Sequence, residues 1–182
     1  MKRGDAPEGG DDDLAVATLL LRKGEAHLYK NEFDRARVTF DSAMQISKNV
    51  SGDNSTHVAS STYCLGVAYH YLGDFAQAKL LFQECIRIQV KLASGDNSNV
   101  VRTLCWIGKL HEKLKEPAKA LERYLYALKV YKNEKSGIDY RIVAMLLHSI
   151  GGLYENDKID LQEMAVKCRY LSAFDYYLRE FV

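Results

Sequence analysis

The chain has 182 residues, of which 47% are hydrophobic, enough for one globular domain with a buried core. Its 25 basic and 24 acidic residues leave a formal net charge of +1, which favours neither nucleic acid nor an anionic membrane as a partner. The longest predominantly apolar run, residues 14–21, is too short to span a bilayer.

The chain is expected to be helical after a short acidic, flexible tail at residues 1–13. One of the aspartates at positions 11–13 is expected to cap the first helix. Helical spacing of apolar residues, interrupted by Gly, Asn, Asp and Pro, defines the helices that follow. The eight expected helices cover about residues 13–29, 33–50, 56–72, 75–93, 99–115, 117–132, 140–155 and 161–182.

One pattern of small and aromatic residues recurs at a fixed 42-residue interval. Its positions are Gly24, Ala36 and Phe40; Gly66, Ala78 and Phe82; and Gly108, Ala120 and Tyr124, with a weaker fourth copy opening at Gly151. A fixed period of this length is typical of solenoid proteins. We expect the small residues where the two antiparallel helices of a hairpin cross, and the aromatic rings between one hairpin and the next.

The order Leu-Gly-x-Ala-Tyr, Gly-Asp-Phe-x-x-Ala and Phe-x-x-Ala resembles the tetratricopeptide repeat. The 42-residue period, with Gly52-Asp53 and Gly95-Asp96 in the linkers, resembles the long-helix variant of kinesin light chains. The resemblance covers residues 14–182. It implies an all-α, right-handed α-solenoid of four antiparallel helix pairs, with repeats at approximately 14–51, 55–94, 98–135 and 139–182.

No pattern in the chain is typical of catalysis or of metal binding. His27 and His111 occupy the position that Tyr69 and Tyr154 hold in the other copies, so we expect them to pack. No histidine has a Cys, Asp or Glu at the spacing of a metal site or a catalytic triad. The four cysteines are far apart, which predicts free thiols in a reducing compartment. We therefore expect a non-catalytic cytoplasmic protein without cofactor or metal.

The resemblance implies a ligand groove on the concave side, lined chiefly by the first helix of each pair. Positions at fixed offsets from the glycines are Leu21, Glu25, Leu28 and Tyr29; Ser60, Tyr63, Val67, His70 and Tyr71; Arg102, Cys105, Lys109, Glu112 and Lys113; and Met145, His148, Glu155 and Asn156. The groove is expected to be aromatic and apolar in its first half and basic in the third repeat. Chaperone-binding relatives hold a terminal carboxylate with Lys and Asn, but the matching positions here are Leu21, Glu25, Tyr63 and Val67.

Two interpretations of this groove stay open. In the first, it binds a peptide with an aromatic or aliphatic anchor near Tyr63 and Tyr71 and with acidic residues near the basic third repeat. In the second, the basic residues are solvated and paired to Glu112 and its neighbours.

The C-terminal segment suggests another surface. Most residues between 165 and 182 are apolar, whereas a terminal repeat normally presents a polar outer face. The chain is then either a fragment of a longer array or a protein that binds another chain at this end. Self-association would use Tyr170, Phe174, Tyr177 and Phe181. The alternative function is therefore an assembly or regulatory subunit that docks through the solenoid ends or the convex face.

Overall fold

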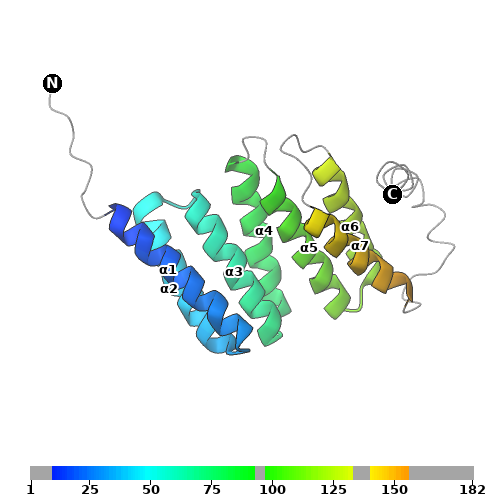
Figure 1. The fold of residues 1–182 in the computed structure, drawn as a ribbon, viewed down its shortest axis with the longest axis horizontal. Helices are drawn as coiled ribbons and strands as arrows, with labels where there is room; N and C mark the ends of the chain where they lie inside the picture. Colours follow the sequence, from blue (N-terminus) through cyan, green and yellow to red (C-terminus); the bar gives the residue numbers. More distant parts are fainter. Residues whose placement is uncertain (1–9, 93–96, 133–139, 156–182) are drawn as a thin grey trace, which may run out of the picture.

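The computed structural model describes residues 10–92, 97–132 and 140–155 (Figure 1). This part of the chain contains seven helices and no strand, which confirms the all-α prediction. The helices are α1 (Gly10–Tyr29), α2 (Phe33–Ser51), α3 (Thr56–Leu72), α4 (Phe75–Leu92), α5 (Ser98–Lys113), α6 (Pro117–Lys132) and α7 (Tyr140–Glu155). The expected eighth helix and most of the expected acidic tail lie outside the described residues.

The observed helix ends differ little from the expected ones, except at the start of α1. This helix begins at Gly10, so Asp11, Asp12 and Asp13 lie in its first turn and not at its N-cap. Their charges still stabilise the positive end of the helix dipole. At α3 the side chain of Ser55 caps the helix, because its hydroxyl accepts a hydrogen bond from the Val58 N–H at 3.3 Å.

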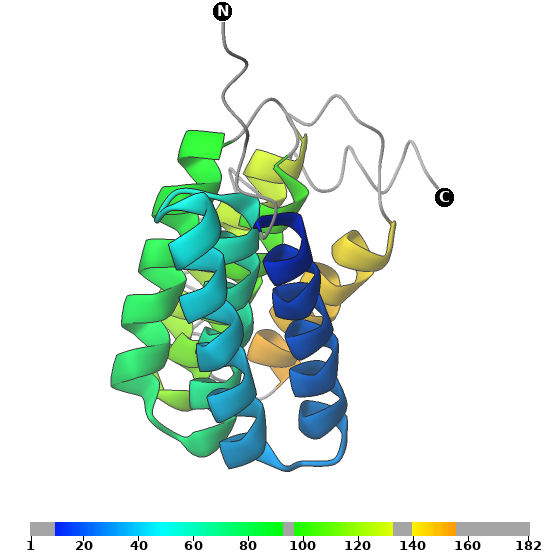
Figure 2. The same cartoon turned by 90° about the vertical axis from the view of Figure 1, so that its left-hand side faces the viewer.

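The helices stack as antiparallel pairs in two layers. α1 packs on α2, α3 on α4 and α5 on α6, and α7 packs against α6. The odd-numbered helices also contact one another in the order α1, α3, α5, α7, so they form one layer of the solenoid (Figure 1). Seen from the first pair, α1 and α2 stand side by side in front of the later pairs (Figure 2). The chain therefore forms a row of helical hairpins.

The turn inside each hairpin has the same backbone form. Asn31, Gly73 and Lys115, which occupy the same position in successive repeats, have φ angles of 58°, 81° and 57°. In each turn, the N–H of the following residue donates to the carbonyl five positions earlier, over 2.9–3.0 Å. Glycine adopts this left-handed conformation freely, whereas other L-residues pay about 1–2 kcal/mol.

The recurring glycines let the two helices of each hairpin approach closely. A Cβ placed on Gly24, Gly66 or Gly108 would lie 2.3, 2.7 or 2.3 Å from a ring atom of Phe40, Phe82 or Tyr124, respectively. These rings are fully buried, so they have little room to move. The close approach at the helix crossing is therefore confirmed in all three described pairs.

The same rings also contact the next hairpin. Phe40 clusters with Leu65 and Ala68 of α3, and Phe82 clusters with Ile107 and Leu110 of α5. The expectation that the rings fill the space between hairpins is thus confirmed. The structure adds that each ring first covers the glycine of its own hairpin.

Candidate functional site

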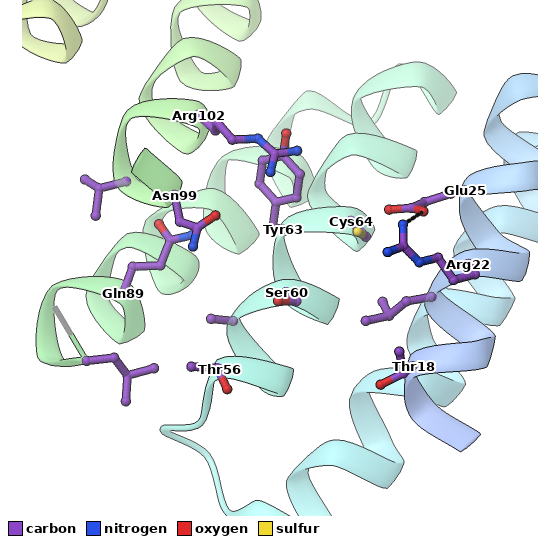
Figure 3. Close-up of a pocket in the computed structure, with 14 residues that line it drawn as sticks. Thr18, Arg22, Glu25, Thr56, Ser60, Tyr63, Cys64, Gln89, Asn99 and Arg102 are labelled. Carbon is purple, nitrogen blue, oxygen red and sulfur yellow. Dashed lines mark hydrogen bonds and ion pairs between the residues drawn. The ribbon is translucent and has the colours of Figure 1, made fainter. Parts of the chain in front are cut away.

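A pocket of about 490 Å³ opens between α1, α3 and α5, with the end of α4 at one side (Figure 3). Five residues expected in the groove line this pocket: Leu21, Glu25, Ser60, Tyr63 and Arg102. The offsets missed the other lining residues, among them Arg22, Gln89 and Asn99. Gln89 and Asn99 lie near the end of α4 and the start of α5, where offsets from a glycine of the first helix are least informative, whereas Arg22 lies inside α1, two residues before Gly24.

The α1 side of the pocket is internally neutralised. The Arg22 guanidinium donates to the Glu25 carboxylate at 3.1 Å, as Figure 3 shows. Both side chains are exposed, and such a surface pair contributes only about 0.2–1 kcal/mol to stability. The Thr18 hydroxyl donates to the Leu14 carbonyl at 2.9 Å. This side therefore offers a ligand little uncompensated charge.

The opposite side carries positive charge without a carboxylate partner. Arg102, Lys109 and Lys113 lie on one face of α5 with Asn99 and Trp106, because steps of three and four residues return to the same face of a helix. We call these five residues the basic face of α5. Within the described part of the chain, none of its three cations lies within 4.0 Å of a carboxylate oxygen.

Two of these cations are held on aromatic rings. The guanidinium carbon of Arg102 lies 5.3 Å from the centre of the Tyr63 ring. The Lys109 Nζ lies 4.6 Å from the centre of the Trp106 ring. Contacts of this kind stabilise a cation by about 0.5–1 kcal/mol at exposed sites. Arg102 and Lys109 are thus positioned before any ligand arrives.

Trp106 connects the two cation–ring contacts, and the sequence prediction did not include it. Its indole N–H donates to the Tyr63 hydroxyl at 2.8 Å. Its ring centre lies 5.2 Å from that of His70 and 5.8 Å from that of Tyr71. Two features of the sequence could have identified Trp106 as a site residue. It is the only tryptophan, and it lies two positions before the repeated glycine Gly108.

Glu112 does not neutralise the basic face in the way that the second interpretation required. Its Oε1 accepts a hydrogen bond from the Tyr124 hydroxyl at 2.5 Å. Burial, and then this hydrogen bond to the carboxylate, raise the pKa of Tyr124. The carboxylate is therefore engaged with α6 and not with Lys109 or Lys113.

Three residues expected on the groove surface are instead buried. Val67, His70 and Cys105 are 5%, 7% and 2% exposed. These positions are covered because α3 and α5 pack against each other and against α4. A ligand in the groove therefore cannot contact much of these side chains.

His70 is the unusual member of that buried set. Neither of its ring nitrogens has a hydrogen-bond partner among the described residues. Burial, followed by the nearby charge of Lys113, lowers its pKa below the ordinary value. The ring packs edge-on against Phe75 and Tyr71, each with its centre 5.7 Å away. His70 therefore behaves as a neutral packing residue at neutral pH.

The remaining expected groove residues lie away from the pocket. Tyr29 and Tyr71 are 90% and 50% exposed at the ends of α1 and α3, and the Tyr71 ring stacks on Phe33 with centres 5.0 Å apart. His148 is exposed on α7. Asn156 lies outside the described residues, as do the four aromatic residues expected to support self-association.

The two histidines expected to pack also hold the hairpin turns. Nδ1 of His27 lies 2.5 Å from Glu32 Oε2, and Nδ1 of His111 lies 2.7 Å from Glu116 Oε2. The hydrogen bond with His27 lowers the pKa of Glu32. At the equivalent place in the second hairpin, the Asp74 carboxylate accepts the Gln77 N–H at 3.1 Å. These histidines therefore have a structural role at the turns.

Burial determines the reactivity of the three cysteines that the structure describes. Burial raises the pKa of Cys64, Cys85 and Cys105 to about 12, 11 and 12, which makes them weak nucleophiles. All three are free thiols. In the described ranges, no three His, Cys, Asp or Glu side chains are grouped to hold a metal ion. None of the described helices combines the length and apolar character needed to cross a membrane.

Comparison with known families agrees with the observed hairpins. Residues 10–91, which include the first two hairpins, match the tetratricopeptide repeat family. The match covers less than half of the chain. The third hairpin continues the same 42-residue interval, with Gly108 against Tyr124. No curated protein sequence matches the chain.

Two solved structures resemble the tetratricopeptide solenoid described here. BtubC (BKLC) from P. vanneervenii superposes with a TM-score of 0.71 and 17% identity, over 96% of this chain and 68% of that one. A tetratricopeptide-like protein from Chlorobium tepidum TLS has a TM-score of 0.60 and 16% identity, over 79% of this chain and 98% of that one. At such identities the likeness shows the fold alone, and the kinesin-light-chain subtype stays a prediction.

Proposed function

We propose that this chain is a non-catalytic interaction module that binds an extended, acidic segment of a partner protein in its groove. Tetratricopeptide repeats in general mediate protein–protein interactions. The observation that carries the proposal is the basic face of α5: its three cations have no carboxylate partner among the described residues, and its Arg102 lines an open pocket. Charge complementarity of this kind speeds association and selects among partners.

The pocket supports a place for the anchor side chain of that segment. Leu21 and Tyr63 supply apolar surface, while Ser60 and Asn99 supply polar groups nearby. Sites for ligands commonly combine apolar walls with a few polar groups that fix orientation. We place the aromatic or aliphatic anchor beside Tyr63, since Tyr71 lies outside the pocket with its ring on Phe33.

A double charge reversal tests the proposal. Lys109→Glu with Lys113→Glu should weaken binding of acidic, tyrosine-containing peptides by at least about tenfold, which corresponds to about 1.4 kcal/mol. Binding is measured by calorimetry on the 182-residue chain at several salt concentrations. The wild-type affinity should also fall as salt rises, because exposed charges are screened.

The matched control makes the same change of charge away from the basic face of α5. Lys79 on α4 and Lys129 on α6 are exposed and lie on other helices. Lys79→Glu with Lys129→Glu should leave affinity nearly unchanged, and thermal melts should show both double variants folded. Equal affinity for the two double variants would contradict a role for the groove.

A second candidate function uses the end of the solenoid. Val16 and Leu19 on α1, the first helix that the structure describes, are 45% and 68% exposed. This apolar surface favours docking of the N-terminal end onto a larger assembly. If Val16→Asp with Leu19→Asp abolishes capture of a partner that the groove variant retains, the assembly role holds.

Light scattering on the purified chain tests the predicted self-association.

A further inference from the structure

Resting on the groove function proposed above, we infer that α5 binds two acidic residues placed three positions apart in a partner segment of polyproline II conformation. The two carboxylates contact Arg102 and Lys109. The segment lies along α5 and not across the helices. The argument depends on how these two cations are held, how far apart they are, and which polar groups stand beside them.

Four side chains form one connected unit. Arg102 lies over Tyr63, Lys109 lies over Trp106, and the Trp106 N–H donates to the Tyr63 hydroxyl at 2.8 Å. The Tyr63 and Trp106 rings therefore have cations of this chain next to them. A partner that approaches this side of the groove meets a guanidinium and an ammonium group in fixed places. Such a surface fits two carboxylates.

The spacing of the two residues along α5 favours one backbone form of the ligand. Arg102 and Lys109 are seven residues apart, so they share a face and their Cα atoms are separated by about 10.5 Å along the helix axis. In polyproline II, residues three apart point to the same side and are separated by about 9.3 Å. In a β-strand, residues three apart point to opposite sides, and residues two apart are separated by only about 6.6 Å. Acid-x-x-acid in polyproline II is therefore the extended pattern that fits.

Polar side chains beside Arg102 favour an extended ligand over a helical one. The Asn99 side-chain amide has no described hydrogen-bond partner, and it lies beside Gln89 at the edge of the pocket (Figure 3). The Gln89 Oε1 accepts from the Thr103 hydroxyl at 3.0 Å, which leaves its amide N–H groups to donate. A polyproline II segment has unpaired backbone carbonyls and N–H groups that need such partners, whereas a helix satisfies its own.

The nearby carboxylates do not compete for the two cations. Glu25, across the pocket on α1, is paired with Arg22, and Glu112 on α5 accepts from Tyr124. A partner carboxylate can form two parallel hydrogen bonds with the Arg102 guanidinium. The ammonium group of Lys109 is less directional, so the spacing requirement is set mainly at Arg102.

Three peptides of identical composition test the inference. Each has twelve residues of Pro, Ser and Ala with one Tyr and two Asp, and the Asp residues are adjacent, two apart or three apart. Binding to the full chain is followed by calorimetry and by the fluorescence of Trp106, the only tryptophan. We expect the three-apart peptide to bind at least about tenfold more tightly than the other two.

Variants then test whether Arg102 and Lys109 cause the preference for the peptide whose Asp residues are three apart. Arg102→Ala and Lys109→Ala should each bring the three-apart peptide to the affinity of the adjacent one. Lys113→Ala should weaken all three peptides equally and keep the preference. Trp106→Phe removes the hydrogen bond to Tyr63 while the chain stays folded. Calorimetry on this variant should show a smaller difference in affinity between the three peptides.

The failures of this inference and of the groove function are distinguishable. Equal, salt-sensitive binding of all three peptides that is lost with Lys109→Glu and Lys113→Glu would overturn the spacing and keep the groove function. Absence of binding by all three would overturn the inference and count against an acidic ligand altogether. A preferred peptide whose circular dichroism becomes helical on binding would also overturn it.

Discussion

The α1 and α5 sides of the groove occupy the same register of the repeat and differ in charge. Equivalent positions, two repeats apart, are Thr18 and Arg102, Arg22 and Trp106, Glu25 and Lys109, and Tyr29 and Lys113. The α1 set contains an internal ion pair, whereas the α5 set carries three cations without a described carboxylate partner. Beneath both, a buried ring covers a glycine in the same way. Groove chemistry and scaffold are therefore separable in this chain.

The largest expected effect tests the scaffold that the two sides share. Phe40→Ala and Tyr124→Ala should each lower the free energy of unfolding by about 3–5 kcal/mol, because both rings are fully buried and truncation leaves a cavity. Urea unfolding followed by circular dichroism measures the loss. A cost below about 1 kcal/mol at either ring would break the equivalence of the first and third hairpins.

The hydroxyl of Tyr124 distinguishes the third hairpin from the first. Tyr124→Phe should cost about 1.5–3 kcal/mol if the hydrogen bond to the charged Glu112 has its usual strength. In the first hairpin Leu28 stands at the position of Glu112, so Phe40→Tyr would bury a hydroxyl without that acceptor and should also destabilise. Urea unfolding of both variants checks this. Neutral behaviour of Phe40→Tyr would show that the two crossings are interchangeable.

Filling the helix crossing should cost less than truncating a ring. Gly108→Ala should destabilise the chain by about 1–3 kcal/mol, since the new Cβ would overlap the Tyr124 ring. The control is Gly10→Ala, where the Cβ would be 3.5 Å from Val50, an ordinary contact. That substitution should be neutral or stabilising by up to about 1 kcal/mol. Equal effects at the two sites in thermal melts would contradict the close crossing.

The scaffold could be predicted from the sequence because each of its residues is constrained by its own hairpin. Glycine and aromatic residues at a 42-residue period indicate where two helices meet, and α2, α3, α4, α6 and α7 begin where expected. Local patterns also fix the turns. These features depend on neighbours along the chain, which a single sequence displays.

The candidate site was less predictable because it depends on contacts between hairpins. Fixed offsets give the direction of Val67 and Cys105 from their helices but not the neighbouring helix that covers them. Whether the Glu112 carboxylate pairs with the lysines or accepts from the Tyr124 hydroxyl depends on side-chain rotamers, which the sequence does not show. The pairing of Trp106 with Tyr63 joins residues 43 positions apart, and no periodic pattern shows it.

His70 should make the free energy of unfolding depend on pH. The equivalent positions in α1 and α5 are Leu28 and Glu112, which are not histidines. Because its folded pKa is lowered, the unfolded chain binds the proton first, so stability falls as pH decreases below about 6.5 and levels off below the folded pKa. His70→Phe keeps a ring and should remove this change. The lowered pKa of Glu32 acts in a separate window, since its contribution is complete above pH 4.5 and is lost in stronger acid. Unfolding between pH 4.5 and 8 isolates the His70 effect.

The smallest expected effect comes from making the charge of the α1 side of the groove more like that of the α5 side. Glu25→Gln breaks the exposed pair with Arg22 and should cost only about 0.2–1 kcal/mol. The freed guanidinium makes the α1 side positive, so acidic peptides should bind about twofold more tightly at low salt, as surface charges at an interface act mainly on association. Stopped-flow association rates measure this, and a weaker affinity would show that Glu25 itself contacts the ligand.

The left-handed turns at Asn31, Gly73 and Lys115 have an evolutionary consequence. Each is closed by main-chain hydrogen bonds inside its own 42-residue unit, so the turn does not depend on the side chains that face the groove. A unit copied by gene duplication inherits its turn intact. Later substitutions at the equivalents of Arg102 and Lys109 can then give the lengthened protein a new partner while every hairpin still closes.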